Sequence, residues 1–203
     1  SNPFRLLKQR NFSPFFFTQF LGAFNDNVFK NALVIMITYQ GARWTTIDPA
    51  FLVITCAGLF ILPFFPLSAT AGELAEKSEK SKLIRYIKFA EIIIALIVIL
   101  GFLLHNIFIL IGALFLLGVQ ASFFGPVKYS ILPQHLEKKD LIAGNGMVEM
   151  ATFIAILIGT ILGGLLIANE DTGIIYVCCV VLFIALLGFF LSFFIPKAEA
   201  SSP

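Results

Sequence analysis

Six long apolar stretches follow one another along this chain of 203 residues, and they constrain its fold more than any other feature. A helix that spans a membrane needs about 20 consecutive, mostly apolar residues, and each stretch reaches that length. None alternates between apolar and polar residues as a transmembrane β-strand does. The sequence therefore predicts an all-α integral membrane protein with six transmembrane helices, at residues 13–39, 50–70, 84–104, 106–126, 142–168 and 174–195.

Composition disfavours most other classes of protein. Hydrophobic residues make up 59% of the chain and charged residues 13%, and the mean hydropathy is +0.95. A soluble domain is nearer half apolar and a quarter charged. A secreted enzyme, a nucleic-acid-binding protein and a disordered linker are all disfavoured, and we expect no nucleic-acid partner. The three cysteines lie inside apolar runs and fit no zinc template, so we also expect no metal.

The predicted bundle covers residues 13–195 as one domain. Residues 1–12 form a short basic stub before it, and residues 196–203 read as the start of a linker to the missing remainder of a longer protein. Within the bundle, Pro63 and Pro66 are expected to bend the second span. The pair Gly125–Pro126 is expected to end the fourth span.

The distribution of basic residues predicts the orientation. Twelve of the fourteen Lys and Arg residues fall on one side of the six spans, and the other side carries Arg43 alone. Loops rich in Lys and Arg stay in the cytoplasm. Both termini, the stub and the linker are therefore predicted to be cytoplasmic.

Two charges inside the first span require an explanation. Asp26 lies about 21 Å along the helix, near the bilayer centre, and Lys30 lies one turn further on. A charge at that depth costs about 2.5–3.5 kcal/mol. The two residues either form an ion pair that joins helices or line a polar substrate cavity. Gln19 and Asn27 share their stripe of the helix, which favours the cavity.

Polar residues also occur in two later spans. Glu149 lies near the inner end of the fifth span and is either a site residue or a cytoplasmic-side gate. Gly159 and Gly163 follow on the same stripe, and this spacing of small residues allows close helix packing. Glu91 in the third span is expected either to snorkel or to pair with Lys88 or with Arg85.

The loop between the second and third spans is rich in charge. It contains Gly72, Glu76, Lys77 and Lys80. This loop is either a solvated turn or an ionic latch between helix ends. No phosphate-binding loop, metal cluster or activated nucleophile occurs in the sequence, so we expect no catalytic residues and no cofactor.

Six spans with both ends inside, joined by a Gly-x-Leu-Ala-Glu-Lys loop, resemble the N-terminal half of a major facilitator superfamily transporter. The resemblance implies that Gly72, Glu76, Lys77 and Lys80 form a cytoplasmic gate. Glu76 stands where the family usually has Asp. The resemblance also implies a missing C-terminal half of six more helices.

Longer motifs are similar to those of bacterial lysophospholipid transporters. They lie at 19–27, 125–132 and 143–149. This resemblance implies a multi-pass protein of the bacterial inner membrane that moves lysophosphatidylethanolamine-type lipids between leaflets. Some members of that family are fused to, or paired with, an acyltransferase and acyl-carrier-protein synthetase, which is therefore a candidate partner.

The same resemblance suggests roles for the charged residues. Asp26 or Glu149 would meet the ammonium of the headgroup, and Lys30 or Lys128 would meet its phosphate. Two alternatives stay open: a membrane anchor that docks a lipid-reacylating enzyme, and an exporter of small solutes with the same fold. The charges inside the first span favour a transporter half, because an anchor does not need them.

Overall fold

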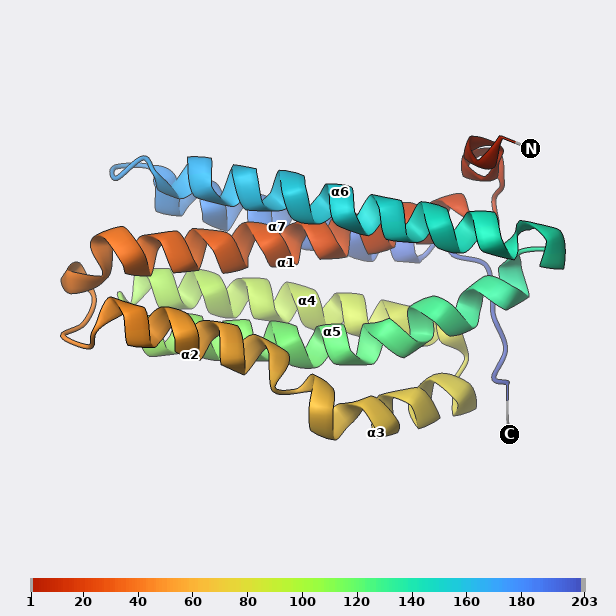
Figure 1. Ribbon diagram of the computed structural model, residues 1–203, viewed down its shortest axis with the longest axis horizontal. Coiled ribbons are helices and arrows are strands. Elements are labelled where there is room, and N and C mark those ends of the chain that lie inside the picture. The colour runs from red at the N-terminus through yellow and green to blue at the C-terminus, as the bar shows by residue number, and fades with distance from the viewer. Residues whose placement is uncertain (1, 202–203) are drawn as a thin grey trace.

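The chain forms an elongated bundle of helices in the computed structural model, which describes residues 2–201 (Figure 1). Within that range, three short 3-10 helices, at Pro3–Lys8, Gly41–Arg43 and Lys138–Asp140, accompany the longer helices. The α-helices are α1 (Ser13–Gln40), α2 (Pro49–Ile61), α3 (Phe64–Lys77), α4 (Lys80–Leu103), α5 (Ile107–His135), α6 (Leu141–Ile167) and α7 (Gly173–Ser192).

The predicted all-α membrane fold is confirmed. Among residues 2–201, five helical segments are long and apolar enough to cross a membrane, and they are Pro49–Lys77, Lys80–Leu103, Ile107–His135, Lys138–Ile167 and Gly173–Ser192. Helix α1 is 28 residues long, but its polar residues lower its hydropathy. Its crossing of the membrane, and with it the count of six, stays a prediction.

Side-chain caps set where several helices begin. Asp48 accepts a hydrogen bond from the backbone N–H of Phe51 at the start of α2. Asn106 does the same for α5, and Glu79 for α4. These caps satisfy backbone donors that a helix leaves free at its first turn.

The two predictions about proline had different outcomes. The second span, where a bend was predicted, is interrupted at Pro63: α2 ends at Ile61 and α3 begins at Phe64, with Pro66 inside α3. The predicted end of the fourth span at Gly125–Pro126 is wrong. Helix α5 continues through Pro126 and Pro133 to His135. Membrane helices tolerate such prolines because neighbouring groups satisfy the backbone that the ring leaves free.

Two helices, α1 and α4, make the main contacts with α7. Helix α1 packs on α6 and α7, while α4 packs on α5 and α7, and both α2 and α3 lie along α5. Glycines let α6 approach α1 closely: a Cβ on Gly159 would lie 2.7 Å from the carbonyl oxygen of Phe24. Gly163 meets the backbone of Val28 in the same way. The packing role predicted for these glycines is therefore confirmed.

A polar layer divides the core into two apolar clusters. One cluster holds Val28, Leu33, Val98 and Leu114 among others, and the second holds Phe15, Ile84 and Ile131 among others. The buried polar side chains between them come from the middle of α1, α4 and α5, and they are Gln19, Asn25, Asn27, Lys88, Glu91 and Gln120.

Residues 196–201 lie against the bundle at the same end as the 3-10 helix Pro3–Lys8 (Figure 1). The backbone N–H of Lys80 donates to the carbonyl of Ala198 at 2.8 Å, and that of Ser201 donates to the carbonyl of Glu76 at 2.8 Å. Gln134 donates to the carbonyl of Glu199. The predicted linker therefore begins as a docked segment, which we call the C-terminal clasp (residues 196–201).

Candidate functional site

A polar cavity of about 380 Å³ opens in the dividing layer. Its polar lining comes from α1, α4, α5 and α6, and aromatic rings of α2, α3 and α5 complete the wall. The residues that define it are Gln19, Asp26, Asn27, Lys30, Lys88, Gln120, Lys128 and Thr152, with Phe60, Phe64 and Phe124.

The cavity brings together most of the substrate-binding residues that the sequence suggested. Gln19, Asp26, Asn27, Lys30 and Lys128 all line it, although α1 and α5 supply them from far apart in the chain. The stripe on α1 faces this space. The binding roles of these side chains stay predictions.

Asp26 and Lys30 do not pair with each other. None of the seven ion pairs within residues 2–201 includes either residue. The Oδ1 of Asp26 is buried without a hydrogen-bond partner in that range. The Nζ of Lys30 lies 5.0 Å from the centre of the Phe60 ring. The cavity therefore presents a carboxyl group and an ammonium group, one helical turn apart, that form no ion pair within residues 2–201.

The buried ion pair of the bundle is instead on α4. Lys88 and Glu91 are 1% and 2% exposed, and Nζ lies 2.9 Å from Oε2. Asn25 donates to Glu91 at 3.1 Å, and Gln120 donates to it at 3.4 Å. Of the alternatives for Glu91, snorkelling is therefore wrong and pairing with Lys88 is confirmed.

Lys88 was absent from the predicted site, because its position in the sequence groups it with the basic loop residues before it. In the structure it lines the cavity together with Asp26. A Cβ on Gly22 of α1 would collide with its Nζ. The signal that could have identified it is the three-residue spacing to Glu91 inside an apolar helix.

Hydrogen bonds join α1 to α6 beside the cavity. Thr152 donates to Oε1 of Gln19 at 3.2 Å, and Gln19 donates to the carbonyl of Val148 at 3.3 Å. Further along, Asn31 donates to Thr160 at 3.0 Å. The polar stripe of α1 therefore serves both the cavity and the contact with α6.

Glu149 lies beside the cavity lining and contacts it through Lys128. Nζ of Lys128 lies 3.2 Å from Oε1 of Glu149, and the hydroxyl of Tyr129 donates to the same oxygen at 2.5 Å. Glu149 is therefore engaged by two side chains of α5.

The predicted gate residues have separate partners in this structure. Lys77 pairs with Glu73 one turn earlier on α3 at 2.5 Å, and Gly72 has open space around it. Lys80 is buried and donates to the carbonyl of Glu199 at 3.0 Å and to Ser201 at 2.8 Å. Lys80 therefore contacts the C-terminal clasp in this structure. A gating role for these residues stays a prediction.

Glu79 fixes the same clasp. It accepts hydrogen bonds from the hydroxyl of Ser81 and from the backbone N–H of Ala198. Partial burial would by itself raise the pKa of Glu79, but these hydrogen bonds outweigh it and hold the pKa below its usual value.

A bundle of membrane-type helices around a cavity lined by ionisable side chains is typical of membrane transport proteins, and comparison with known families agrees. The model of the Major Facilitator Superfamily matches residues 15–203. The chain belongs to that superfamily, which confirms the resemblance found in the sequence.

Curated relatives narrow the comparison. The chain is 29% identical over 185 residues to the lysophospholipid transporter LplT of Serratia proteamaculans, covering 91% of this chain and 43% of the relative. It is 30% identical over 184 residues to LplT of Yersinia enterocolitica, covering 90% and 42%. The chain thus spans less than half the length of these relatives, a share consistent with an N-terminal half.

Proposed function

We propose that this chain is the N-terminal half of a transporter that moves lysophospholipid across the bacterial inner membrane. The names of the relatives support this cargo. The observation that carries the proposal is the cavity lining itself: Asp26 and Lys30 of α1 lie there outside any ion pair of residues 2–201, whereas Lys88 and Lys128 are paired with carboxylates.

The headgroup of lysophosphatidylethanolamine complements that arrangement. It carries a phosphate anion and an ammonium cation separated by two carbons. Residues one turn apart on a helix have Cβ atoms about 5–6 Å apart. Asp26 would accept hydrogen bonds from the ammonium, and Lys30 would meet the phosphate. Burying the zwitterion would then supply the partners that both side chains lack.

Lys88 and Lys128 have a secondary role in this proposal. Each already has a carboxylate partner, Glu91 and Glu149 respectively. Their ammonium groups lie in the cavity lining and make it locally positive. Because each lysine is paired with a carboxylate, the two pairs add no net charge. A second six-helix half would close the cavity, and movement of the two halves about it would expose it to each leaflet in turn.

Transport without catalysis follows from this proposal. The cargo would be delivered to a lipid-reacylating acyltransferase and acyl-carrier-protein synthetase on the cytoplasmic side. Co-purification of such an enzyme with the natural protein would support the partnership. Failure to detect it would leave transport unaffected, since the cavity does not depend on it.

The test uses the natural protein that contains this chain, reconstituted in vesicles with labelled lysophosphatidylethanolamine. Asp26→Asn is expected to lower uptake by about 10–100-fold, because a charged hydrogen bond contributes about 1.5–3 kcal/mol. The variant should still reach the membrane. Asp171→Asn, at an exposed loop position, is the matched control and should transport normally.

The double variant Asp26→Asn with Lys30→Gln separates binding from structure. If the charges meet the headgroup, this protein is stable and inactive. A stable double variant that transports at the unmodified rate would show that neither charge contacts the cargo, and the proposal would fail.

A further inference from the structure

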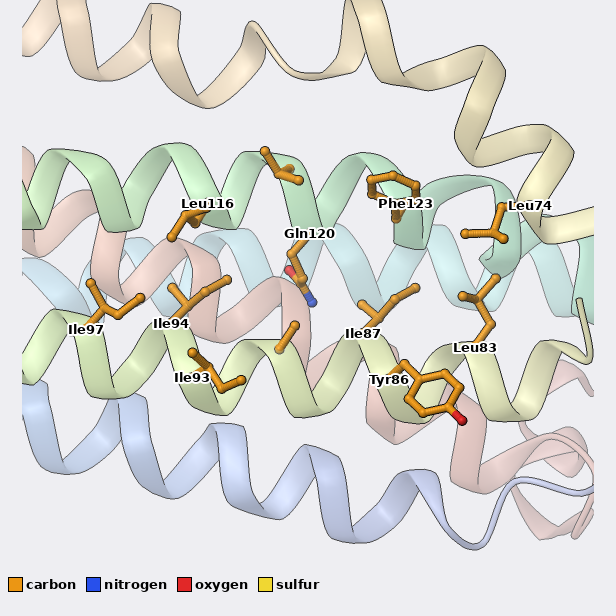
Figure 2. A pocket seen from close by; sticks show the side chains of 12 residues that line it. Leu74, Leu83, Tyr86, Ile87, Ile93, Ile94, Ile97, Leu116, Gln120 and Phe123 are labelled. Carbon is orange, nitrogen blue, oxygen red and sulfur yellow. The ribbon is translucent and has the colours of Figure 1, made fainter.

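An apolar groove of about 410 Å³ runs along the outside of the bundle between α4 and α5 (Figure 2). Ile87, Ile94 and Ile97 of α4 face Leu116 and Phe123 of α5 across it, and Leu74 of α3 stands at one end. Apart from Gln120 and the hydroxyl of Tyr86, the side chains that line it are hydrocarbon. Such a surface suits a hydrocarbon chain, which makes no hydrogen bonds.

A second apolar hollow lies on the other flank of α4, towards α7. Phe89 of α4 and Phe189 and Phe193 of α7 line it, together with Arg85 and Tyr86. Tyr86 also lines the first groove. The exposed ring of Tyr86 therefore separates two apolar channels that converge at the beginning of α4.

Two cations line the α4–α7 hollow near the beginning of α4. Lys82 is exposed and lines the second hollow and a smaller one next to the groove. Arg85 lies 5.4 Å from the centre of the Phe193 ring, and its Nε is buried without a hydrogen-bond partner in residues 2–201. No ion pair within that range includes either residue.

Glu79, which lines the smaller hollow together with Lys82, forms no ion pair with either cation within residues 2–201. Glu79 accepts hydrogen bonds from Ser81 and from Ala198 of the C-terminal clasp instead. An ammonium and a guanidinium at the end of an apolar groove, on a membrane helix, match the phosphate of a lipid. The guanidinium can bind phosphate oxygens in a bidentate way.

We propose that this surface is a binding site for a two-chain anionic phospholipid. Its phosphate binds Lys82 and Arg85, one acyl chain lies in the α4–α5 groove, and the second lies in the α4–α7 hollow. Two apolar channels on either side of Tyr86 select two chains. Two unmatched cations select an anionic headgroup over a zwitterionic one. The groove shares one lining residue, Gln120, with the transport cavity, and the proposal does not depend on the proposed cargo.

Photocrosslinking tests the site on the intact chain in nanodiscs. The probe is phosphatidylglycerol with a diazirine near the end of one acyl chain, and phosphatidylcholine with the same chain is the reference. Crosslinks should map to residues 83–97, 116–123 and 189–193. Labelling by the phosphatidylglycerol probe should exceed that by the phosphatidylcholine probe by at least several-fold.

Variants define the contacts. Lys82→Gln with Arg85→Gln should remove most of the preference for phosphatidylglycerol, whereas Arg85→Lys should retain part of it. Ala90→Phe should block crosslinks in the α4–α5 groove while leaving those at 189–193. Lys8→Gln with Arg10→Gln removes two exposed cations away from the groove and should change nothing.

Competition tests the two-chain claim. Unlabelled phosphatidylglycerol should displace the probe at a several-fold lower concentration than lysophosphatidylglycerol. Equal labelling by both probes, or a preference that survives in a folded Lys82→Gln/Arg85→Gln variant, would mean nonspecific surrounding lipid only and would overturn the proposal. Equal competition by the one-chain lipid would overturn the assignment of two channels.

Discussion

At the scale of single residues, the buried Lys88–Glu91 pair depends on a residue that has no side chain. The absence of a Cβ at Gly22 leaves the space that Nζ of Lys88 occupies between α1 and α4. Two desolvated ions are tolerable only when each keeps its partner and further hydrogen bonds. Asn25 and Gln120 supply those hydrogen bonds to Glu91.

Breaking that pair should therefore destabilise the bundle. Glu91→Gln leaves the ammonium of Lys88 buried without its counter-charge, and the expected loss is about 3–5 kcal/mol in the free energy of unfolding. Thermal unfolding in detergent measures it. Lys88→Met combined with Glu91→Gln should recover most of the loss. A single variant as stable as the unmodified protein would contradict the role of the pair.

The sequence located part of this site and missed part of it for physical reasons. Asp26 and Lys30 were recognisable because a charge inside an apolar helix is costly wherever the helix packs. Lys88 was not, because its burial depends on the rotation of α4 and on the space at Gly22, a residue 66 positions earlier. Contacts between helices determine both the rotation of α4 and the space at Gly22. The hydropathy of a single helix carries no information about those contacts.

At the scale of helices, α6 approaches α1 closely at two glycines, Gly159 and Gly163. Gly159 and Gly163 bring the backbone of α1 within contact distance, and Gln19 and Asn31 on α1 bond to threonines of α6. The two helices thus hold the polar stripe in a fixed rotation towards the cavity.

Adding one methyl group should separate these helices. In Gly159→Ala the new Cβ would lie 2.7 Å from the carbonyl oxygen of Phe24, and we expect about 1–3 kcal/mol of destabilisation from overpacking. Gly146→Ala, on the same helix with no atom within 4 Å of its Cβ, is the matched control. It should be neutral or slightly stabilising. Equal melting temperatures for the two variants would refute the packing role.

The ends of the helices were harder to predict than their existence. The apolar runs located each helix, but α5 continues nine residues beyond the predicted end at 126. Hydropathy measures where lipid contacts a helix, and a helix can continue past that region when packing and hydrogen bonds support it. Residues 196–203 were predicted to be a linker. The docking of residues 196–201 could not be predicted from their own composition, because it depends on Lys80 and Glu79, which lie far away in the sequence.

Acid should release the C-terminal clasp. Because the pKa of Glu79 is held below its usual value, the ionised form stabilises the docked state. That stability is present above the unfolded pKa and is lost as the pH falls through the lower, folded pKa. Hydrogen exchange at the Ala198 amide should accelerate at acidic pH, after correction for the intrinsic rate.

Glu79→Gln should reproduce the acid effect at neutral pH. Loss of the charge weakens the hydrogen bond from Ala198 by roughly 1 kcal/mol, or about five-fold in local opening. Glu73→Gln, which affects only an exposed pair on α3, should leave exchange at Ala198 unchanged. Similar acceleration in both variants would contradict a specific role for Glu79.

At the scale of the whole molecule, the ends of the bundle differ. One end of the bundle holds the turn between α3 and α4, the 3-10 helix Pro3–Lys8 and the C-terminal clasp (Figure 1). The other end holds the α6–α7 connection. The basic residues concentrate at the first of these ends, which is why we predict that it faces the cytoplasm.

Thiol labelling of whole cells decides the orientation. With the native cysteines 56, 178 and 179 replaced by Ala, single cysteines are introduced as Ser78→Cys and Thr172→Cys. An impermeant reagent should label the cysteine at position 172 alone, and permeabilised cells should label both. Labelling at 78 but not at 172 in intact cells would reverse the predicted topology.

The docked C-terminal clasp determines where a mechanical load enters the bundle. Residue 201 is tied by backbone hydrogen bonds to the end of α3, and Ala198 to the start of α4. Tension applied at residue 201 therefore passes first into the α3–α4 turn and only afterwards into α7. This turn contains the loop motif of the superfamily, at residues 72–80. A force on residue 201 would therefore also displace that loop.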